Sequence, residues 1–214
     1  MDQVAALLGS RYGLAVERLE PAPRGWTGET YAATVRDGAR FFVKVFPKDR
    51  LPRTAAAALP VLAELHRLGL TQVSRPISAT SGALHERLGD DLVVVFEYLD
   101  AVPVAFTFGG ERLGGLIARL HQQTERVASP LARETFEALY ADELVLTHGD
   151  WPFNLLQSAD GTIYLVEWDE LLLAPAERDI WFARDDPAFS RGYRARRGGH
   201  AENELATAFC VHHR

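Results

Sequence analysis

The stretch VLTHGDWPFNLLQSADGTIYLVEWDE, residues 145–170, carries the strongest signal in this chain of 214 residues. Asp150 and Asn154 lie four residues apart in an expected loop between two apolar stretches. Glu167 and Asp169 follow the next apolar segment, and residues two apart in an extended segment share a face, so we expect both acids to point the same way. Oxygen ligands that converge from neighbouring short strands suit Mg²⁺, a hard cation. Asp150 could then orient or deprotonate the hydroxyl of an acceptor.

A lysine upstream completes a pattern typical of phosphoryl transfer. That reaction needs a positioned nucleophile, a held metal ion and neutralised phosphate charge, with little covalent work by the protein. Lys44 lies in the middle of the apolar segment RFFVKVF, residues 40–46, where it is either exposed on an edge strand or turned inward to meet an anion. Gly25 and Gly28 bracket a turn that could cover phosphates, although glycines in turns commonly have no such role.

The rest of the chain predicts a β-rich start and a mostly helical remainder. The expected elements are a helix over 2–12, strands over 14–19 and 40–46 with a third between them, a helix over 54–68, strands over 84–88 and 92–98, and helices over 111–124 and from 176. Asp-Gly pairs at 37–38 and 160–161 predict hairpin turns, and Pro60 is expected to kink its helix or begin a second one. This order favours a two-lobed α+β protein, with an N-terminal lobe over 1–98 and a C-terminal lobe over 99–214.

The residues from 185 onward are polar and weakly patterned, so no regular element is expected there. Four arginines, at 191, 194, 196 and 197, are interpreted as part of a solvated loop, with a phosphate or partner patch as the alternative. The C-terminal FCVHHR does not look like a structured end.

Composition and charge exclude several function classes. With 47% hydrophobic and 24% charged residues, the chain has the composition of an ordinary globular protein. A net charge of −6 disfavours nucleic-acid binding, and the apolar runs are too short to span a membrane. The single cysteine, Cys210, excludes an intramolecular disulfide and a cysteine-based zinc cluster, which agrees with a cytoplasmic location.

Three segments resemble one known family. HGDWPFNLL, residues 148–156, is similar to the His-Gly-Asp-x-x-x-x-Asn catalytic loop of the aminoglycoside phosphotransferases, which have the protein-kinase fold. Residues 164–182, YLVEWDELLLAPAERDIWF, resemble that family's metal segment. The motif Leu-Ala-Pro-x-Glu-Arg-Asp within them is similar to the spectinomycin-phosphotransferase-like branch in particular. Residues 18–46 resemble the family's N-terminal hairpin and lysine strand.

The resemblance implies transfer of the γ-phosphate of ATP or GTP to an alcohol group of a small molecule, with Mg²⁺. Asp150 would be the catalytic base or would orient the acceptor. The metal ligands would be Asn154 and Glu167, with Asp169 on the same strand face. The family includes kinases of antibiotics, choline and homoserine, so a cationic or aminocyclitol-like acceptor and a role in antibiotic resistance are expectations at the level of the branch.

The resemblance also implies a nucleotide site between the lobes. Lys44 would contact the α- and β-phosphates and pair with Glu64 on the following helix. Gly25 and Gly28 would cover the phosphates. Backbone groups of Glu97 and Leu99 would meet the purine, while His148 and Asp179 would brace the catalytic loop.

Two departures from the family pattern leave alternatives open. Glu167 stands where the family has aspartate, and its extra methylene shifts the metal ligand by about an ångström, which can cost about 10²-fold in rate. Asp169 could take over the metal, or catalysis could be weak. Only about two dozen residues separate Thr124 from Thr147, where the family has a larger helical insertion. The acceptor pocket is then open, completed by a second subunit, or used by a large acceptor, and a monomer and a homodimer both fit.

Each of these assignments has a simpler alternative. Asp150 and Asn154 could cap a turn, and Glu64 could be a helix-surface acid. Among the four tryptophans, Trp151 is the one placed to act as a substrate platform, although tryptophans more often anchor the core. At the level of the whole protein, the alternatives are a pseudokinase that binds nucleotide without turnover and a remnant that binds none.

Overall fold

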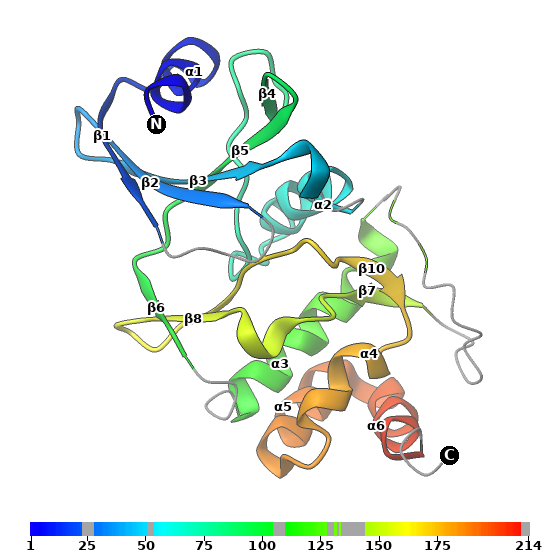
Figure 1. The fold of residues 1–214 in the computed structure, drawn as a ribbon. Helices are drawn as coiled ribbons and strands as arrows, with labels where there is room; N and C mark the ends of the chain where they lie inside the picture. Colours follow the sequence, from blue (N-terminus) through cyan, green and yellow to red (C-terminus); the bar gives the residue numbers. More distant parts are fainter. Residues whose placement is uncertain are drawn as a thin grey trace.

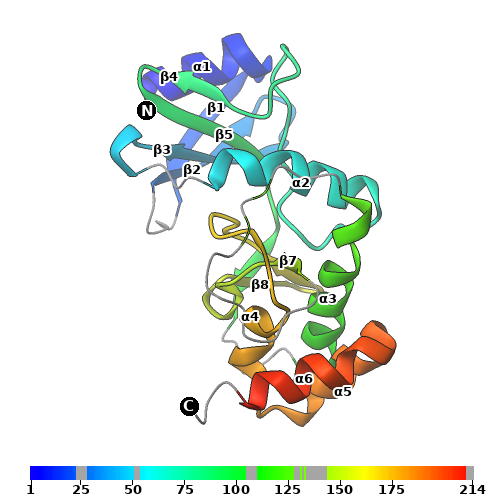
Figure 2. The same ribbon diagram turned by 90° about the vertical axis from the view of Figure 1, so that its right-hand side faces the viewer.

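The computed structural model describes residues 1–22, 28–50, 54–104, 110–127, 131, 133 and 144–210. These residues form two lobes, one built on an antiparallel sheet and one made mainly of helices (Figure 1). From the side, α2 (Ala55–Arg67) lies between the two lobes (Figure 2). The predicted two-lobed α+β architecture is confirmed.

The N-terminal lobe contains a five-stranded antiparallel sheet of order β1-β2-β3-β5-β4, with α1 packed on one face. Its elements are α1 (Asp2–Tyr12), β1 (Val16–Pro21), β2 (Glu29–Val35), β3 (Arg40–Phe46), β4 (Glu86–Leu88) and β5 (Asp91–Glu97). Gly38, with φ 87°, lies in the predicted hairpin turn between β2 and β3. In the sheet Lys44 lies opposite Thr30 of β2 and Val94 of β5. Lys44 is therefore on a central strand, and the edge-strand alternative is wrong.

Helix α2 packs against both lobes. It continues through Pro60, which is exposed, so the proline neither ends the helix nor begins a second one. Leu59 packs with apolar residues of β3 and β5, whereas Leu62 and Leu65 belong to the same core cluster as α3. Because α2 shares its apolar surface in this way, it fixes the distance between the lobes. The lobe boundary after residue 98 stays a prediction.

The C-terminal lobe is built around α3 (Gly110–Gln122), whose predicted apolar stripe of Leu113, Leu116, Ile117 and Leu120 is buried. Two small antiparallel sheets, of order β10-β7 and β6-β8-β9, carry the loops of interest. Their strands are β6 (Ala101–Pro103), β7 (Val145–Thr147), β8 (Leu155–Ser158), β9 (Ile163–Leu165) and β10 (Leu172–Ala174). The later helices are α4 (Glu177–Ile180), α5 (Pro187–Arg197) and α6 (Ala201–Cys210).

Short 3₁₀ turns connect these elements, at Lys48–Arg50, Thr124–Arg126, Trp151–Phe153, Trp181–Ala183 and Gly198–His200. The predicted hairpin at 160–161 joins β8 to β9, with Gly161 at φ 83°. In the described part of the chain, no helix combines the length and apolar character that a membrane span requires.

The expectation of an irregular tail after residue 185 is wrong, because α5 and α6 occupy this segment. Asp186 caps α5 by accepting the N–H of Ala188 at 2.8 Å, and Pro187 occupies the first turn, where its missing N–H costs nothing. The arginines at 191, 194, 196 and 197 lie on or at the end of this helix and not in a loop. The helix was hard to recognise because its buried face consists of few apolar residues, mainly Phe189 and Tyr193.

Two glycines allow α3 and α5 to cross closely. A Cβ atom on Gly114 would overlap the carbonyl oxygen of Phe189, and one on Gly192 would overlap the carbonyl oxygen of Glu111. The helix backbones thus approach within a distance that no side chain permits. This crossing holds α5 against the helix that carries the core stripe.

Replacing Gly192 by alanine should destabilise the protein, because the new methyl group must push α5 away from α3. Overpacking of this kind costs about 1–3 kcal/mol, which corresponds to a fall in Tm of roughly 2 to 12 °C for a chain of this size. Thermal unfolding followed by circular dichroism measures the change. Gly199→Ala is the matched control, because a Cβ atom at Gly199 meets open space. Equal Tm values for the two variants would contradict the close crossing.

Candidate active site

The loop between β7 and β8 holds Asp150 and Asn154 in one compact turn. Gly149 has φ 82°, and a Cβ atom there would overlap the guanidinium group of Arg178, so glycine suits this position on both counts. The Asn154 side-chain amide donates to the backbone carbonyl of Asp150 at 2.7 Å and to its carboxylate Oδ2 at 3.0 Å. Asn154 therefore orients the Asp150 carboxylate.

The catalytic-loop candidate is joined to the segment after β9. The Val166 N–H donates to the carbonyl oxygen of Asn154 at 3.0 Å, and the His148 ring Nε2 lies 2.9 Å from the Val166 carbonyl oxygen. The His148 ring also packs on Trp168, with centroids 4.5 Å apart. These contacts fix the position of Glu167 relative to Asp150.

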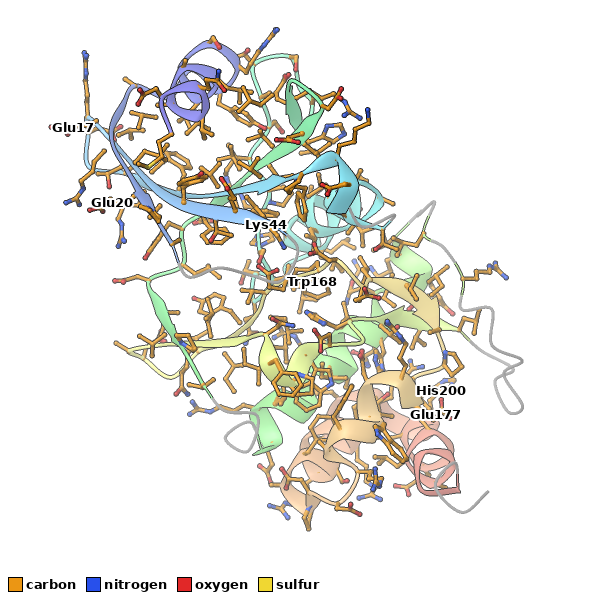
Figure 3. The ribbon with its side chains drawn as sticks, in the orientation of Figure 1. Glu17, Glu20, Lys44, Trp168, Glu177 and His200 are labelled. Atoms are coloured by element: carbon orange, nitrogen blue, oxygen red, sulfur yellow. The ribbon has the colours of Figure 1, made fainter. Side chains whose placement is uncertain are left out.

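Lys44 closes the site from the opposite lobe. Its ammonium group donates to Glu167 Oε2 at 2.5 Å and to Asp169 Oδ2 at 2.8 Å, and its side chain is buried. Figure 3 shows Lys44 of the N-terminal lobe and Trp168 of the C-terminal lobe at the junction between the lobes. The two carboxylates therefore converge on a single cation, as expected, but not through strand alternation, because β9 ends at Leu165 and Glu167 is not extended. The Thr54 hydroxyl, directly before α2, donates to the Asp169 carbonyl oxygen and ties the same segment to the N-terminal lobe.

Glu167 adopts an unusual backbone conformation. Its φ of 60° makes it the only non-glycine residue with positive φ in the described part of the chain. Such a conformation costs about 1–3 kcal/mol, and it persists only where surrounding contacts enforce it. Here the Val166 N–H bond on one side and the ion pair with Lys44 on the other supply those contacts. The turn aims the Glu167 carboxylate at the interlobe cation.

The predicted pairing of Lys44 with Glu64 is wrong. Glu64 instead forms a bidentate ion pair with Arg67, at 2.5 and 2.7 Å, one turn further along α2. The hydrogen bond from Arg67 lowers the pKa of Glu64. Lys44 has its charge balanced by Glu167 and Asp169, so no third acid is needed beside it. Glu64 matches the alternative of a helix-surface acid.

Among the residues predicted to contact nucleotide, Gly28 lies beside the strand of Lys44, Glu97 ends β5, and Leu99 follows it. Gly28 approaches β3 so closely that a Cβ atom would overlap the Val45 carbonyl oxygen, one residue from Lys44. Gly25 lies outside the described residues. The Glu97 N–H is already used, since it donates to the Arg75 carbonyl oxygen at 2.9 Å, and the Leu99 carbonyl accepts from Ala101. A purine meeting this hinge could therefore use the Glu97 carbonyl and the Leu99 N–H.

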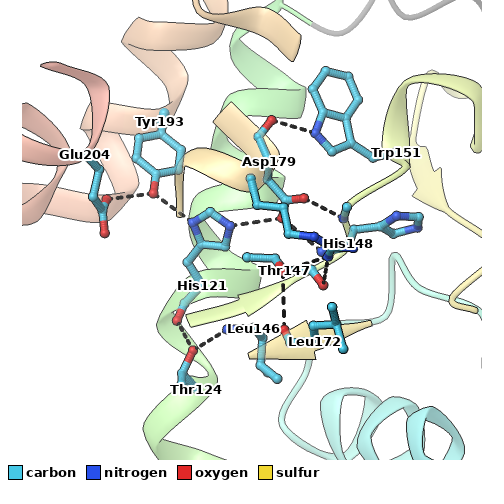
Figure 4. Close-up of polar contacts among 12 residues, drawn as sticks. His121, Thr124, Leu146, Thr147, His148, Trp151, Leu172, Asp179, Tyr193 and Glu204 are labelled. Atoms are coloured by element: carbon cyan, nitrogen blue, oxygen red, sulfur yellow. Dashed lines mark hydrogen bonds and ion pairs between the residues drawn. The ribbon is translucent and has the colours of Figure 1, made fainter. Parts of the chain in front are cut away.

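Asp179 braces the candidate catalytic loop through hydrogen bonds to its backbone, as predicted. Its fully buried carboxylate accepts the N–H of His148 at 3.0 Å and the N–H of Gly149 at 2.7 Å (Figure 4). Its carbonyl oxygen accepts the indole N–H of Trp151 at 2.8 Å. Trp151 is fully buried by these contacts, so the suggestion that it forms a substrate platform is wrong. Phe153, two residues on, is instead 79% exposed.

A chain of buried polar groups continues from Asp179 to the C-terminal helix. His121 Nε2 lies 3.1 Å from Asp179 Oδ2, and His121 Nδ1 lies 2.8 Å from the Tyr193 hydroxyl. Tyr193 donates to Glu204 at 2.7 Å (Figure 4). Glu204 in turn pairs with Arg197 at 2.7 Å. A lone histidine on a helix has no ligand spacing, so the sequence around His121 gives no signal of a metal or catalytic site. Its position on the buried stripe of α3 was the available signal.

The electrostatics of the brace follow from burial and pairing. Burial alone would raise the pKa of Asp179, but the hydrogen bond and charge of His121, together with the Gly149 N–H and His148, outweigh it and lower that pKa. Burial lowers the pKa of His148, against the opposing charges of Asp179 and Asp150. The folded protein therefore favours an ionised Asp179 beside a neutral His148. Arg178 completes the brace by donating to the Thr147 hydroxyl at 2.9 Å and the Glu170 carbonyl oxygen at 3.0 Å.

The chemistry of the donor set suits a hard cation bound together with phosphate. Glu167 and Asp169 present two carboxylates to one cation, and Asn154 adds an amide close by. Mg²⁺ commonly uses one or two carboxylates and completes its shell with water and substrate phosphates. Within the described ranges, no group of three or more His, Cys, Asp or Glu side chains could hold a metal ion alone. The residues therefore fit a metal that arrives with a nucleotide better than a site built only from protein.

Comparison with known families identifies this arrangement. The family model described as the phosphotransferase enzyme family matches residues 18–143. The chain belongs to the phosphotransferase enzyme family. The family resemblance and the kinase-like fold expected from the sequence are thereby confirmed.

Solved structures of phosphotransferases share the fold. A spectinomycin phosphotransferase in complex with ADP and spectinomycin superimposes with a TM-score of 0.73 at 18% identity, over 90% of this chain and 79% of that chain. An amicoumacin kinase in complex with AMP-PNP, Ca²⁺ and its antibiotic gives 0.70 at 16% identity, over 95% and 82%. The macrolide 2′-phosphotransferase of Brachybacterium faecium gives 0.70 at 16% identity, over 99% and 92%. Comparison with the curated proteins gives no match.

The lowered pKa of His148 predicts that acid destabilises this phosphotransferase through the brace. A group whose pKa is lower in the folded state contributes stability above its unfolded pKa and loses that contribution as the pH falls. For histidine the loss begins near pH 6.5 and continues downward, and Asp179 adds a second loss below about pH 4. Urea unfolding at pH 5.0 to 7.5 should show the unfolding free energy decreasing toward acid, with a smaller slope in His148→Gln.

His85→Gln is the matched control for this measurement, because His85 lies in the N-terminal lobe away from the brace. Its slope should follow that of the natural protein. A His148→Gln slope equal to the natural one would contradict a neutral, buried His148.

Proposed function

We propose that this chain transfers the γ-phosphate of ATP or GTP to the hydroxyl of a small molecule. The single observation that carries the proposal is the convergence of Lys44, Glu167 and Asp169 on one point beside the Asp150–Asn154 loop. Membership in the phosphotransferase enzyme family supports it. The cytoplasm, where ATP and GTP are abundant, is the proposed location. The lobes over 1–98 and 99–214 would hold the nucleotide and the acceptor between them.

Asp150 is the proposed base. The acceptor oxygen attacks the γ-phosphorus, the bond from that phosphorus to the β–γ bridging oxygen breaks, and the hydroxyl proton passes to the Asp150 carboxylate as the nucleoside diphosphate leaves. Asn154 holds this carboxylate at 3.0 Å, and the Asp179 brace fixes the backbone before it. A base fixed in this way avoids the rate loss that follows from misplacing a reacting group by about 1 Å.

Lys44, Glu167, Asp169 and Asn154 are the proposed ligands of the nucleotide phosphates and Mg²⁺. The bound metal would neutralise charge on the transferred phosphate. Lys44 would leave its carboxylate partners and donate to the α- and β-phosphates. Glu167 and Asp169 would then bind Mg²⁺ in place of the lysine ammonium group. The Glu97 carbonyl and Leu99 N–H would meet the purine, and the segment that ends at Gly28 would cover the phosphates.

The acceptor is proposed to be a hydroxyl-bearing antibiotic or amino alcohol with an apolar face. Phe153 lies three residues after Asp150 and is 79% exposed, so it offers an aromatic surface next to the attacking hydroxyl. Spectinomycin, amicoumacin and macrolides are the compounds named with the structural relatives. These compounds are therefore the first acceptors to screen, and antibiotic resistance is the corresponding biological role.

Replacing Asp150 by asparagine should abolish transfer while leaving nucleotide binding largely intact. Loss of a positioned general base costs about 10²- to 10⁴-fold in kcat. Release of ADP or GDP in the presence of an acceptor found by screening measures the rate, and calorimetry measures nucleotide affinity. The control variant is Asp160→Asn, an exposed turn residue on the β8–β9 hairpin, which should keep full activity. A fully active Asp150→Asn enzyme would contradict the proposed role of Asp150 as the base.

Thermal unfolding with ATP or GTP, each with and without Mg²⁺, tests the nucleotide site without an acceptor. A ligand at a hundred times its Kd stabilises a protein by about 2.7 kcal/mol, or about 5 to 10 °C here. The expected result is a rise that depends on Mg²⁺. Glu167→Gln and Asp169→Asn, measured separately, should identify the main metal ligand as the variant that loses this dependence. No rise with any nucleotide, from a protein that unfolds cooperatively, would contradict the proposal.

Binding without turnover is the second candidate function. The observation that favours it is the tight pairing of Lys44 with both acids, because the metal must displace that ammonium group. This candidate expects a nucleotide-induced rise in Tm that is the same with and without Mg²⁺, and no transfer to any screened acceptor. The same thermal measurement thus separates the two functions.

A further inference from the structure

A second concave site lies beside the buried stripe of α3. There α3, α5 and the β8–β9 hairpin line an open groove of about 560 Å³. We call it the arginine groove, after Arg112 and Arg119 of α3 and Arg196 of α5, which line it. None of the candidate active-site residues lines this groove.

Two of the three arginines are positioned by neutral acceptors. Arg112 donates to the Gly161 carbonyl oxygen at 3.0 Å. Arg119 donates to the Gln72 side-chain oxygen at 2.6 Å, and the Gln72 amide in turn donates to the Ile163 carbonyl oxygen at 3.0 Å. These bonds fix the guanidinium groups without neutralising them. Within the described part of the chain, none of the three arginines forms an ion pair with a carboxylate.

The two acids at the groove are occupied elsewhere. Glu111 pairs with Arg191 at 2.6 Å, outside the groove. The Asp160 carboxylate accepts the Ser158 hydroxyl at 2.6 Å and the Thr162 N–H at 2.9 Å within its own turn. The other arginines of α5 are also neutralised, since Arg194 pairs with Glu202 and Arg197 with Glu204. Arg196 thus differs from its neighbours on the helix.

Two of the three guanidinium charges act on each other. Burial, and after it the like charge of Arg196, lower the pKa of Arg119. Arg112 and Arg119 lie seven residues apart, so their Cα atoms are about 10 Å apart along α3. An anion that reaches both would relieve the repulsion and gain charge-assisted hydrogen bonds from forked donors.

We propose that the arginine groove binds a small anion with two or three linked phosphoryl groups. Arg112 and Arg119 are held by acceptors on different elements, the Gly161 carbonyl oxygen and the Gln72 side chain, so a short chain of phosphoryl groups can engage both guanidinium groups in place. Gly115 and Gly161 line the groove without side chains and leave room for such a chain. This site is separate from the proposed nucleotide site and does not depend on kinase activity.

Isothermal titration calorimetry with sodium tripolyphosphate tests the proposal. The titration is done without divalent metal and at constant ionic strength. Because tripolyphosphate could also reach Lys44, the natural protein and the Lys44→Ala variant are both titrated. We expect binding to persist in Lys44→Ala and to weaken about ten-fold or more when Arg112→Ala or Arg196→Ala is added.

Arg194→Ala is the matched control, because this arginine lies on the same helix but pairs with Glu202. It should bind as the Lys44→Ala background does. Arg112 and Arg196 are exposed, so their variants are expected to keep the Tm of that background, which thermal unfolding checks. Two results would overturn the proposal. One is loss of all binding in Lys44→Ala, and the other is an equal loss in Arg194→Ala and Arg196→Ala, which indicates screening by general charge only.

Discussion

The buried carboxylate of Asp179 is the constraint on which the rest of the site depends. A charge removed from water is tolerated only when donors surround it. Here the donors are the backbone N–H groups of His148 and Gly149 together with the ring of His121. Two of these three donors belong to the loop that carries Asp150. The loop cannot take another conformation without leaving this charge unpaired in the core. The free-energy penalty of an unpaired buried carboxylate therefore keeps the loop rigid.

That rigidity is transmitted across the interlobe space. The loop bonds to Val166, which precedes Glu167, and Glu167 with Asp169 then holds Lys44 of the central strand β3. Lys44 lies in the middle of a five-stranded sheet, and water does not reach its buried side chain. Its charge must therefore be balanced by groups from the other lobe. The two lobes are therefore joined by charge at the same point where α2 joins them by apolar packing.

Local sequence patterns predicted the helices, strands and turns and the geometry of the site over short sequence distances. They did not predict contacts between residues that are far apart in the sequence. The stripe on α3 and the hairpins at Gly38 and Gly161 follow from periodicity and turn chemistry. Lys44 pairs with Glu167 and Asp169 because of how the two lobes pack together, and no local pattern encodes that packing. The family pattern predicted Glu64 as its partner instead. His121 lacked any spacing signal because its partners are 58 and 72 residues away in the sequence. Helix α5 was missed because its contact with α3 depends on Gly192 and on only two large apolar residues, Phe189 and Tyr193, which make no long apolar stripe.

The backbone of Glu167 changes how its substitution for aspartate is understood. From the sequence, an extra methylene displaces a metal ligand outward. In the fold, the left-handed conformation at this residue turns the longer side chain back toward the interlobe cation, and its carboxylate reaches Lys44 at 2.5 Å while Asp169 reaches the same atom at 2.8 Å. The extra methylene therefore does not prevent the Glu167 carboxylate from meeting the same Lys44 nitrogen as Asp169. What distinguishes a kinase from a binding module is then the competition between Lys44 and a metal ion for these two acids, and the length of Glu167 by itself does not decide it.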